Sequence, residues 1–240
     1  MKAASQLNAL VRENARLKGD LRTIASRISH DLRTPLGGII TPGEVLKEVL
    51  KEREPSLVTF ADSILDSADE ISRLITRVSF VAKASANPSP KQRVAMGEVV
   101  SEALQRLESL KLKKKATVNE PDSWPEVPGV GTWLETIWSN LLANALQHGG
   151  KSPHIELGWR QEPEKICFWV RDNGGGVVDR NLKLFQPFDS LYELNSAPGL
   201  GLSIVQRLVE LQDGDCGYEL QARGGAYFFF TLPTDGGREL

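Results

Sequence analysis

The feature that most limits how this chain can fold is an apolar heptad near its start. The seam positions of this heptad hold six aliphatic residues and one asparagine: Leu7, Leu10, Asn14, Leu17, Leu21, Ile24 and Ile28. Residues spaced alternately by three and four lie along one side of a helix, and so narrow a stripe is typically buried against another helix. The heptad predicts a coiled coil, preferably a parallel dimer. A helix packed within one chain is the alternative.

The first helix is expected to continue to about Leu50 and to be followed by a second. Pro35 removes a backbone donor and should bend or break the first helix, and residues 51–56 read as a turn with Ser56 as N-cap. The second helix carries one broad apolar stripe: Leu57, Phe60, Ile64, Ala68, Ile71, Leu74, Ile75, Val78 and Val81. Two helices cannot bury such stripes alone, so two hairpins should form a dimeric four-helix bundle.

A change of pattern marks a second region. Residues 84–90 have the composition of a linker. Beyond them, helices are expected over 98–110, 133–148 and 202–211, a solvated basic turn over 111–115, a loop over 121–131, and strands at Val118 and over 154–159, 166–170, 217–220 and 226–232. Strands with short connections and three helices predict an α/β sandwich, in which one mixed sheet is covered on one face. The whole chain is therefore expected to be α+β.

Composition excludes several classes of protein. The net charge of the 240 residues is −2, so no strong attraction to nucleic acid or to an anionic membrane is expected. Cys167 and Cys216 are too few for a disulfide framework or a metal cage, and fit a reducing, cytosolic setting. No apolar run approaches the roughly 20 residues needed to span a bilayer, and no signal peptide opens the chain. A cytoplasmic location is expected, with any external sensor outside this chain.

A compact set of reactive side chains lies on the first helix. Residues 29–36 read Ser-His-Asp-Leu-Arg-Thr-Pro-Leu and contain one of only three histidines. A neutral imidazole can attack through one ring nitrogen while a neighbouring carboxylate holds the other N–H or takes its proton. His30 and Asp31 are therefore candidates for a nucleophile and its acid–base partner. Taken alone, such a pair is more often a surface histidine among ordinary helix charges.

A row of amides lies on the apolar helix expected over 133–148. Asn140, Asn144 and Gln147 or His148 share one face of it. An amide buried without a partner is unfavourable, and an amide oxygen is a hard ligand that suits Mg²⁺. The row therefore indicates a ligand site. Amides that satisfy nearby backbone groups are the alternative.

Two glycine-rich segments complete the pattern. Asp172 ends a buried strand and is followed by Gly174, Gly175 and Gly176, where a carboxylate can accept from an exocyclic amine and a flat ring can approach the backbone. By itself this is more often an ordinary turn. Residues 198–202, Pro-Gly-Leu-Gly-Leu, open a helix, and free N–H groups at a helix N-terminus bind phosphate.

Taken together, these residues resemble one family. Residues 30–36 resemble the phospho-acceptor box of the sensor histidine kinases of two-component systems. The three later clusters resemble, in order and spacing, the N, G1 and G2 boxes of the ATP-binding domain shared by these kinases, DNA gyrase and MutL, and residues 184–188 resemble the kinases' F box. The resemblance spans roughly residues 20 to 232. It implies a coiled-coil signalling helix (1–27), a dimerisation and histidine phospho-acceptor domain (20–86) and a catalytic ATP-binding domain (92–235).

The resemblance also implies roles for residues. His30 would be phosphorylated from ATP and would pass the group to an aspartate of a response-regulator receiver domain, with Asp31 as its acid–base partner and Thr34 placing water in a phosphatase reaction. The implied nucleotide contacts are Asn144 for Mg²⁺, Asn140 for the phosphates, Asp172 for the adenine amine, Gly174 and Gly176 for the base pocket, and Gly199, Leu200, Gly201 and Leu202 for the phosphate loop. Residues 177–198 would be a mobile lid that Phe185 and Phe188 anchor to the helical bundle.

The chain departs from the family pattern at two places. Gln147 and His148 stand where members often have Lys and then Tyr or Phe. Two alternatives follow: a phosphate cation is missing, or Lys151 or Arg180 substitutes for it. Residues 197–198 are Ala-Pro where Gly and Thr or Ser are usual, which stiffens the hinge of the lid. The departures leave two rival hypotheses open: a dimeric scaffold with a degenerate nucleotide pocket, and a nucleotide-gated ATPase without histidine transfer.

Overall fold

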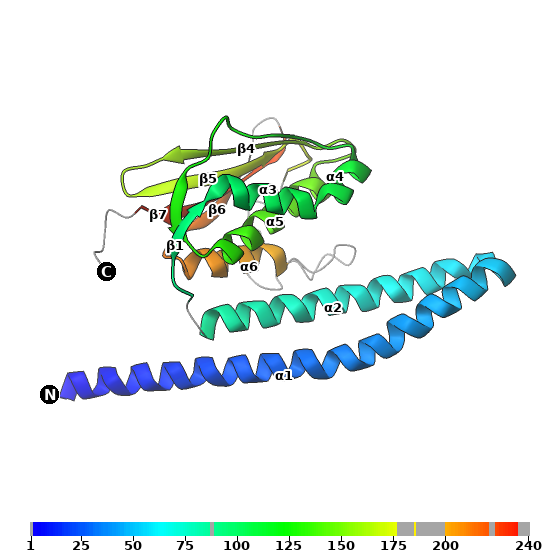
Figure 1. The fold of residues 1–240 in the computed structure, drawn as a ribbon, viewed down its shortest axis with the longest axis horizontal. Helices are drawn as coiled ribbons and strands as arrows, with labels where there is room; N and C mark the ends of the chain where they lie inside the picture. Colours follow the sequence, from blue (N-terminus) through cyan, green and yellow to red (C-terminus); the bar gives the residue numbers. More distant parts are fainter. Residues whose placement is uncertain (1, 87–88, 177–184, 186–199, 221–223, 235–240) are drawn as a thin grey trace. The chain divides into compact units, whose positions relative to one another are not determined.

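The computed structural model describes residues 2–86, 89–176, 185, 200–220 and 224–234 (Figure 1). The chain divides into two compact units, Met1–Pro88 and Ser89–Leu240.

The first unit is a helical hairpin. Helix α1 (Lys2–Arg53) is followed by a 3-10 turn, η1 (Pro55–Leu57), and by α2 (Val58–Ala86). Of the two outcomes expected at Pro35, a bend or a break, the structure has no break, because α1 continues through both Pro35 and Pro42 to Arg53. Figure 1 shows instead that α1 curves along its C-terminal half, where both prolines lie. Ser56 lies within η1 and does not cap α2, because the chain enters α2 through that turn.

Small residues form the seam between the two helices. On α2 the buried positions recur every seven residues, at Ala61, Ala68, Ile75 and Ala82. Ala68 and Ile75 pack with Leu36 of α1. Near the turn, Lys47 Nζ lies 2.6 Å from Asp62 Oδ1, and this contact raises the pKa of Lys47.

Packing of α1 on α2 leaves a large apolar face uncovered. The exposed apolar side chains of the hairpin are Ile24, Ile28, Leu32, Ile39, Val45, Leu46, Val49, Leu57, Phe60, Ile64, Ile71 and Val78. Ile24 and Ile28, the last two seam positions of the heptad, are 55% and 51% exposed. The apolar stripes predicted from the sequence are therefore only partly used within one chain.

The second unit contains a mixed five-stranded sheet, in agreement with the prediction. Its strand order is β2 (Thr117–Asn119), β4 (His154–Gln161), β5 (Lys165–Asp172), β7 (Ala226–Pro233) and β6 (Cys216–Leu220). The β2–β4 pair is parallel and the other pairs are antiparallel. A second, two-stranded sheet joins β1 (Gln92–Ala95) to β3 (Glu126–Gly129). The prediction of a continuous loop over 121–131 is thus wrong, because β3 pairs with a strand far away in the sequence.

Four helices accompany the sheet in the described part of this unit: α3 (Met96–Arg106), α4 (Glu108–Lys114), α5 (Gly131–His148) and α6 (Leu200–Glu210). The single helix expected over 98–110 is divided at Leu107, whose N–H bonds to the Leu104 carbonyl three residues back. The basic run expected in a turn lies mostly on α4, and Lys115, with φ of +52°, caps its C-terminal end.

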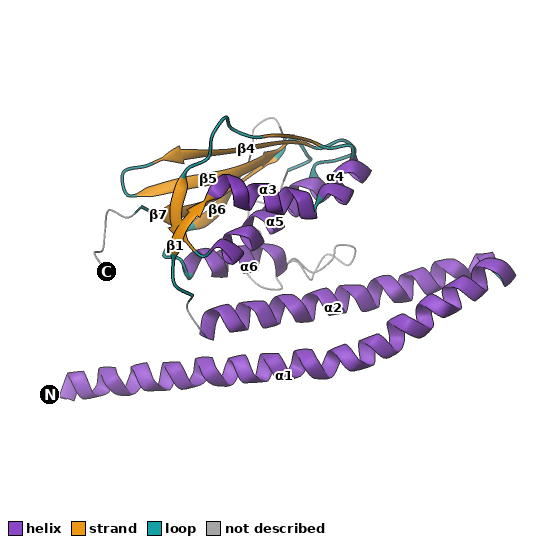
Figure 2. Cartoon of the chain, viewed as in Figure 1, coloured by secondary structure: helices purple, strands orange, loops and turns teal. Residues whose placement is uncertain are grey.

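The core lies between the sheet and the helices. Figure 2 shows α3, α5 and α6 on one face of the five-stranded sheet. The Trp138 ring of α5 meets Phe168 and Phe230 of the sheet edge-on, at centroid distances of 6.3 and 5.5 Å, and its N–H donates to the Met96 sulfur. Aromatic rings from one helix and two strands thus fill the centre, as expected for a sandwich covered on one face.

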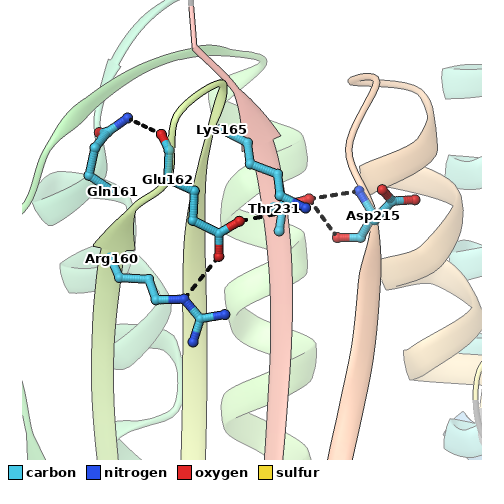
Figure 3. Close-up of polar contacts among 6 residues, drawn as sticks. All are labelled: Arg160, Gln161, Glu162, Lys165, Asp215 and Thr231. Atoms are coloured by element: carbon cyan, nitrogen blue, oxygen red, sulfur yellow. Dashed lines mark hydrogen bonds and ion pairs between the residues drawn. The ribbon is translucent and has the colours of Figure 1, made fainter.

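Polar contacts hold the register at one end of the sheet (Figure 3). In the β4–β5 hairpin, Glu162 accepts from Arg160 at 2.9 Å, and this hydrogen bond lowers the pKa of the Glu162 carboxyl. Lys165 Nζ lies 3.6 Å from the same carboxylate. On the neighbouring strands, the Thr231 hydroxyl accepts from the Asp215 backbone N–H at 3.1 Å and lies 3.3 Å from the Asp215 carbonyl.

Candidate functional site

His30 and Asp31 form an exposed pair on α1. The His30 and Asp31 side chains are 84% and 77% exposed, and His30 Nδ1 lies 3.1 Å from Asp31 Oδ1. An ionised carboxylate can only accept, so this contact places the imidazole proton on Nδ1 and leaves the Nε2 lone pair free for attack. Thr34, one helical turn further on, is also exposed. The three residues assigned to chemistry on α1 therefore lie together and open to solvent.

The buried hydroxyls of Ser29, the residue before His30, and of Ser79 on α2 form a pair that the sequence analysis did not identify. The Ser29 and Ser79 hydroxyls contact each other and both lie near the Ala25 carbonyl, at 2.7 and 3.2 Å. The contact joins α1 to α2 next to the histidine. Ser29 lies four residues after the buried Ala25, and Ser79 lies four residues after the buried Ile75 and three before the buried Ala82, so heptad spacing is the sequence signal that could have found them.

Asp172 ends β5 and is buried, with 6% exposure. Its Oδ1 accepts from the Gly174 backbone N–H at 2.8 Å and from the Ala226 N–H at 3.4 Å. The carboxylate thus joins the turn after β5 to the start of β7. As a buried acceptor held by two backbone donors, it can also receive a hydrogen bond from an amine.

The backbone closes tightly around Asp172 because glycines line it. A Cβ added at Gly174 would lie 2.2 Å from the His148 carbonyl, and one at Gly225 would lie 2.1 Å from the Asp172 carbonyl. Gly176 has φ of +72°, a conformation that favours glycine. The sequence analysis identified Gly174 and Gly176 but missed Gly225, since it follows Asp172 by more than 50 residues.

The expected amide row meets the first turn of α6. The Asn140 side-chain N–H donates to the Thr136 carbonyl at 2.7 Å, while Oδ1 faces Gly201, where an added Cβ would lie 3.0 Å away. Asn144 follows one turn along and is half-buried. Asn140 therefore satisfies a backbone group, as the alternative reading proposed, and its oxygen still lies at the helix N-terminus. Leu202 is half-buried in the same turn of α6.

Other expected nucleotide contacts lie at the edge of this site or beyond the described residues. Gln147, His148 and Lys151 are exposed near the end of α5. Almost all of the expected lid lies outside the described residues, and so do Arg180, Phe188, Gly199 and residues 197–198. Leu200 is the first residue of α6. The Phe185 ring packs 6.5 Å from Tyr218 and 6.4 Å from Phe228 on the sheet. Its expected contact with the helical bundle stays a prediction.

The described residues narrow the possible chemistry of the second unit. Burial raises the pKa of the Cys216 thiol to about 12 and also raises that of Cys167, so neither is suited to act as a thiolate nucleophile. Over the ranges given above, no group of three or more His, Cys, Asp or Glu side chains could hold a metal ion. A divalent ion here would depend on amide oxygens such as that of Asn144 and on its ligand's phosphates.

Two family models match the chain. Residues 20–87 match the His Kinase A (phospho-acceptor) domain. Residues 129–236 match the histidine kinase-, DNA gyrase B- and HSP90-like ATPase domain.

Curated relatives match nearly the whole chain. The methanogenesis regulatory histidine kinase FilI of Methanothrix harundinacea is 28% identical over 98% of this chain and 27% of its own length. The alginate biosynthesis sensor protein KinB of Pseudomonas aeruginosa is 26% identical over 87% of this chain and 36% of its own length. The chain thus spans about a third or less of these relatives.

Solved structures have a similar fold. Full-length ShkA, crystallised with AMPPNP, matches with a TM-score of 0.68 at 22% identity, over 88% of this chain and 45% of that one. The histidine kinase AdeS of Acinetobacter baumannii matches with a TM-score of 0.58 at 17% identity, over 86% of this chain and 98% of that one.

Proposed function

The chain belongs to the sensor histidine kinases of two-component systems, and we propose that it phosphorylates itself on His30 from ATP. The phosphoryl group then passes to an aspartate of a response-regulator receiver domain. The single observation that carries this proposal is the contact between His30 and Asp31 on the exposed side of α1. It leaves one ring nitrogen free for attack and gives the other an acceptor.

The reaction balances with the groups at hand. Nε2 of His30 attacks the γ-phosphorus, an N–P bond forms, and the bond to the bridging oxygen breaks as ADP leaves. Attack leaves the His30 ring positively charged, because Nε2 is then bonded to phosphorus while Nδ1 still carries its proton. The charged ring is more acidic than the neutral imidazole, so the Nδ1 proton passes to Asp31. Both side chains are exposed, so a nucleotide can reach them without rearrangement of the hairpin.

The second unit supports nucleotide binding. The buried Asp172 carboxylate would accept the adenine amine, in the backbone cradle formed by Gly174 and Gly176. Asn140 and the free N–H groups at the start of α6 would hold the phosphates. Asn144 would hold Mg²⁺, which supplies charge neutralisation on the phosphates when bound.

The uncovered apolar face of the hairpin supports a homodimer. From Leu57 of η1 through α2, exposed apolar side chains recur every seven residues, at Leu57, Ile64, Ile71 and Val78. A second copy of the hairpin would cover them in a four-helix bundle, with the N-terminal heptad as a coiled-coil lead-in. The proposed domains are the signalling helix 1–27, the dimerisation and phospho-acceptor domain 20–86 and the ATP-binding domain 92–235.

Thr34 supports a second activity at the same place. Its exposed hydroxyl lies one turn beyond His30, where it would orient water against a phospho-aspartate of the docked regulator.

The scaffold hypothesis, in which nucleotide binding is lost, depends on Gln147 and Pro198.

No helix in the described ranges has the length and apolarity needed to cross a membrane.

Labelled ATP tests the proposal. Wild-type protein with Mg²⁺ should acquire an acid-labile, alkali-stable label, which His30→Gln should abolish while ADP binding persists. His154→Gln is the matched control, because His154 lies on β4 in the other unit. A label that survives in His30→Gln would disprove the assignment.

Nucleotide binding has its own test. Asp172→Asn should abolish measurable binding of ADP, because the amide presents an N–H to the adenine amine in place of an acceptor. Asp122→Asn, at an exposed position of the same unit, is the control. If Asp172→Asn binds ADP as the wild type does, the adenine assignment is wrong.

A further inference from the structure

Gln212 is a fully buried amide just beyond the end of α6. Its Oε1 accepts from the Val130 N–H at 2.9 Å, and its Nε2 donates to the Leu208 carbonyl at 3.0 Å. A buried amide is unfavourable unless both of its groups are bonded. Gln212 therefore joins the C-terminal end of α6 to the residue that precedes α5.

Lys91 meets the same point from the start of the second unit. Its Nζ donates to the backbone carbonyl of Gln212 at 2.9 Å and to the Asp213 carboxylate at 2.8 Å. A cation at the C-terminal end of a helix is favourable there because the last carbonyls carry partial negative charge. Gln92, the next residue, pairs with Gly129 beside Val130. Three segments far apart in the sequence thus meet at Gln212.

The other end of α6 lies at the candidate nucleotide site. Gly201, in its first turn, faces Asn140 of α5. Because Gln212 contacts the start of α5 while Gly201 contacts its middle, the two helices run antiparallel. Gly201 and Gln212 are separated by about 16 Å along a helix at 1.5 Å per residue. A small rotation of α6 about Gln212 would therefore displace Gly201 relative to Asn140.

We propose that Gln212 is a positioning residue for the nucleotide, and that Lys91 connects the segment between the two units to it. The amide of Gln212 sets the angle between α5 and α6, and so the distance between Asn140 and the phosphate-binding turn. A change in the segment that leads into Lys91 acts on the end of α6 and reaches Gly201 through the rigid helix. This inference rests on the proposed function, since it places the nucleotide phosphates at Asn140 and Gly201.

The test compares four variants of the full chain: Gln212→Met, Lys91→Met, the double variant, and Arg93→Met as a control. Met approximates the length of Gln and of the Lys stem without their polar groups. Arg93 is a cation on β1, two residues beyond Lys91, and it pairs with Glu126 of β3. Calorimetry with ADP and Mg²⁺, at a temperature where every variant is folded, measures the dissociation constant.

We expect Gln212→Met to weaken ADP binding about tenfold, within the usual range of coupling between sites, and Lys91→Met about threefold, just below that range. The double variant should bind no more weakly than Gln212→Met, because Lys91 and the Gln212 amide hold the same end of α6 and their effects are therefore not additive. Arg93→Met should bind as the wild type does. Unchanged ADP affinity in Gln212→Met and Lys91→Met, even with lower melting temperatures, would reduce Gln212 to a structural residue and overturn the proposal.

Hydrogen exchange gives a second readout at the distant end of α6. Backbone amides of residues 202–205 should exchange faster in Lys91→Met than in the wild type or in Arg93→Met. Faster exchange confined to residues near Lys91 would also overturn the proposal. ADP binding does not require His30. Loss of His30 labelling in the wild type would therefore defeat the proposed function alone, whereas failure of the wild type to bind ADP would overturn both.

Discussion

The helical hairpin and the α/β sandwich bury their apolar residues in opposite ways. In the sandwich, large side chains such as Trp138, Phe168 and Phe230 are almost completely buried, and the one large exposed aliphatic side chain among its described residues is Leu112. In the hairpin, most of the buried side chains that the structure describes are small, and a dozen of the described large apolar side chains are exposed. The sandwich therefore contains a complete core. The hairpin contains only a half-core, that is, an apolar face of which part is buried within one chain and part is exposed.

This difference indicates where each unit obtains its stability. A complete core makes folding independent of protein concentration, while a half-core is completed by a second chain and is stabilised by mass action. Under the proposed function, His30 would be presented by a dimer, and the nucleotide site by a unit that folds alone. Four predictions test this contrast, in order of decreasing effect.

Trp138→Ala should unfold the sandwich and leave the hairpin intact. Loss of a fully buried tryptophan costs about 3–5 kcal/mol, because a cavity remains where four aromatic and sulfur contacts were made. Differential scanning calorimetry should show the sandwich transition shifted down and the hairpin transition in place. Trp169→Ala, at a half-buried site, should have a smaller effect. A single transition that shifts as a whole would show that the units are not independent.

Ile71→Lys should weaken the dimer about a hundredfold, or about 2.7 kcal/mol, since a charge would replace an anchor of the shared core. Ile71 is 46% exposed in one chain. Analytical ultracentrifugation over a range of concentrations measures the change. Leu112→Lys is the matched control, because Leu112 is 67% exposed but belongs to the sandwich. Equal dimer affinity in both variants would contradict the half-core interpretation.

Glycines of the two units should respond to alanine with opposite signs. A Cβ at Gly158 would lie 2.1 Å from the Trp169 ring, whereas one at Gly37 of α1 meets nothing within 4 Å. Gly158→Ala should destabilise the sandwich by about 1–3 kcal/mol through overpacking, and Gly37→Ala should stabilise the hairpin by about 0.5–1 kcal/mol through helix propensity. Urea denaturation of each variant measures both. Destabilisation by Gly37→Ala would place a partner chain against that position.

Ser79→Ala should destabilise the hairpin by about 1 kcal/mol, the usual net contribution of one hydrogen bond. The double variant Ser29→Ala/Ser79→Ala should lose less than the sum of the two single losses, because the two hydroxyls share one contact and one acceptor, the Ala25 carbonyl. Denaturation followed by circular dichroism at constant protein concentration gives both values. Additive losses would show that the two hydroxyls act independently.

Local patterns in the sequence predicted most of the elements and much of the candidate site. Helical periodicity located both helices of the hairpin, and alternation located β4, β5, β6 and β7. The motif around His30 and the residues Asn140, Asp172 and Gly201 were identified because each lies in a short, recognisable stretch. Their assigned roles remain proposals. The strands β1 and β3 and the division at Leu107 were missed, since they arise from pairing and packing with distant residues.

The sequence by itself determined which residues are apolar, which are reactive and at what spacing they recur, because these are properties of neighbours along the chain. The tertiary structure alone decided which apolar residues are used within one chain: Ile75 of α2 is buried and Ile71, one turn before it, is exposed. It also decided that Gly225 lies against Asp172 and that Lys91, Val130 and Gln212 meet. Such contacts join residues separated by tens of positions, and their energies depend on geometry that exists only once the chain has folded.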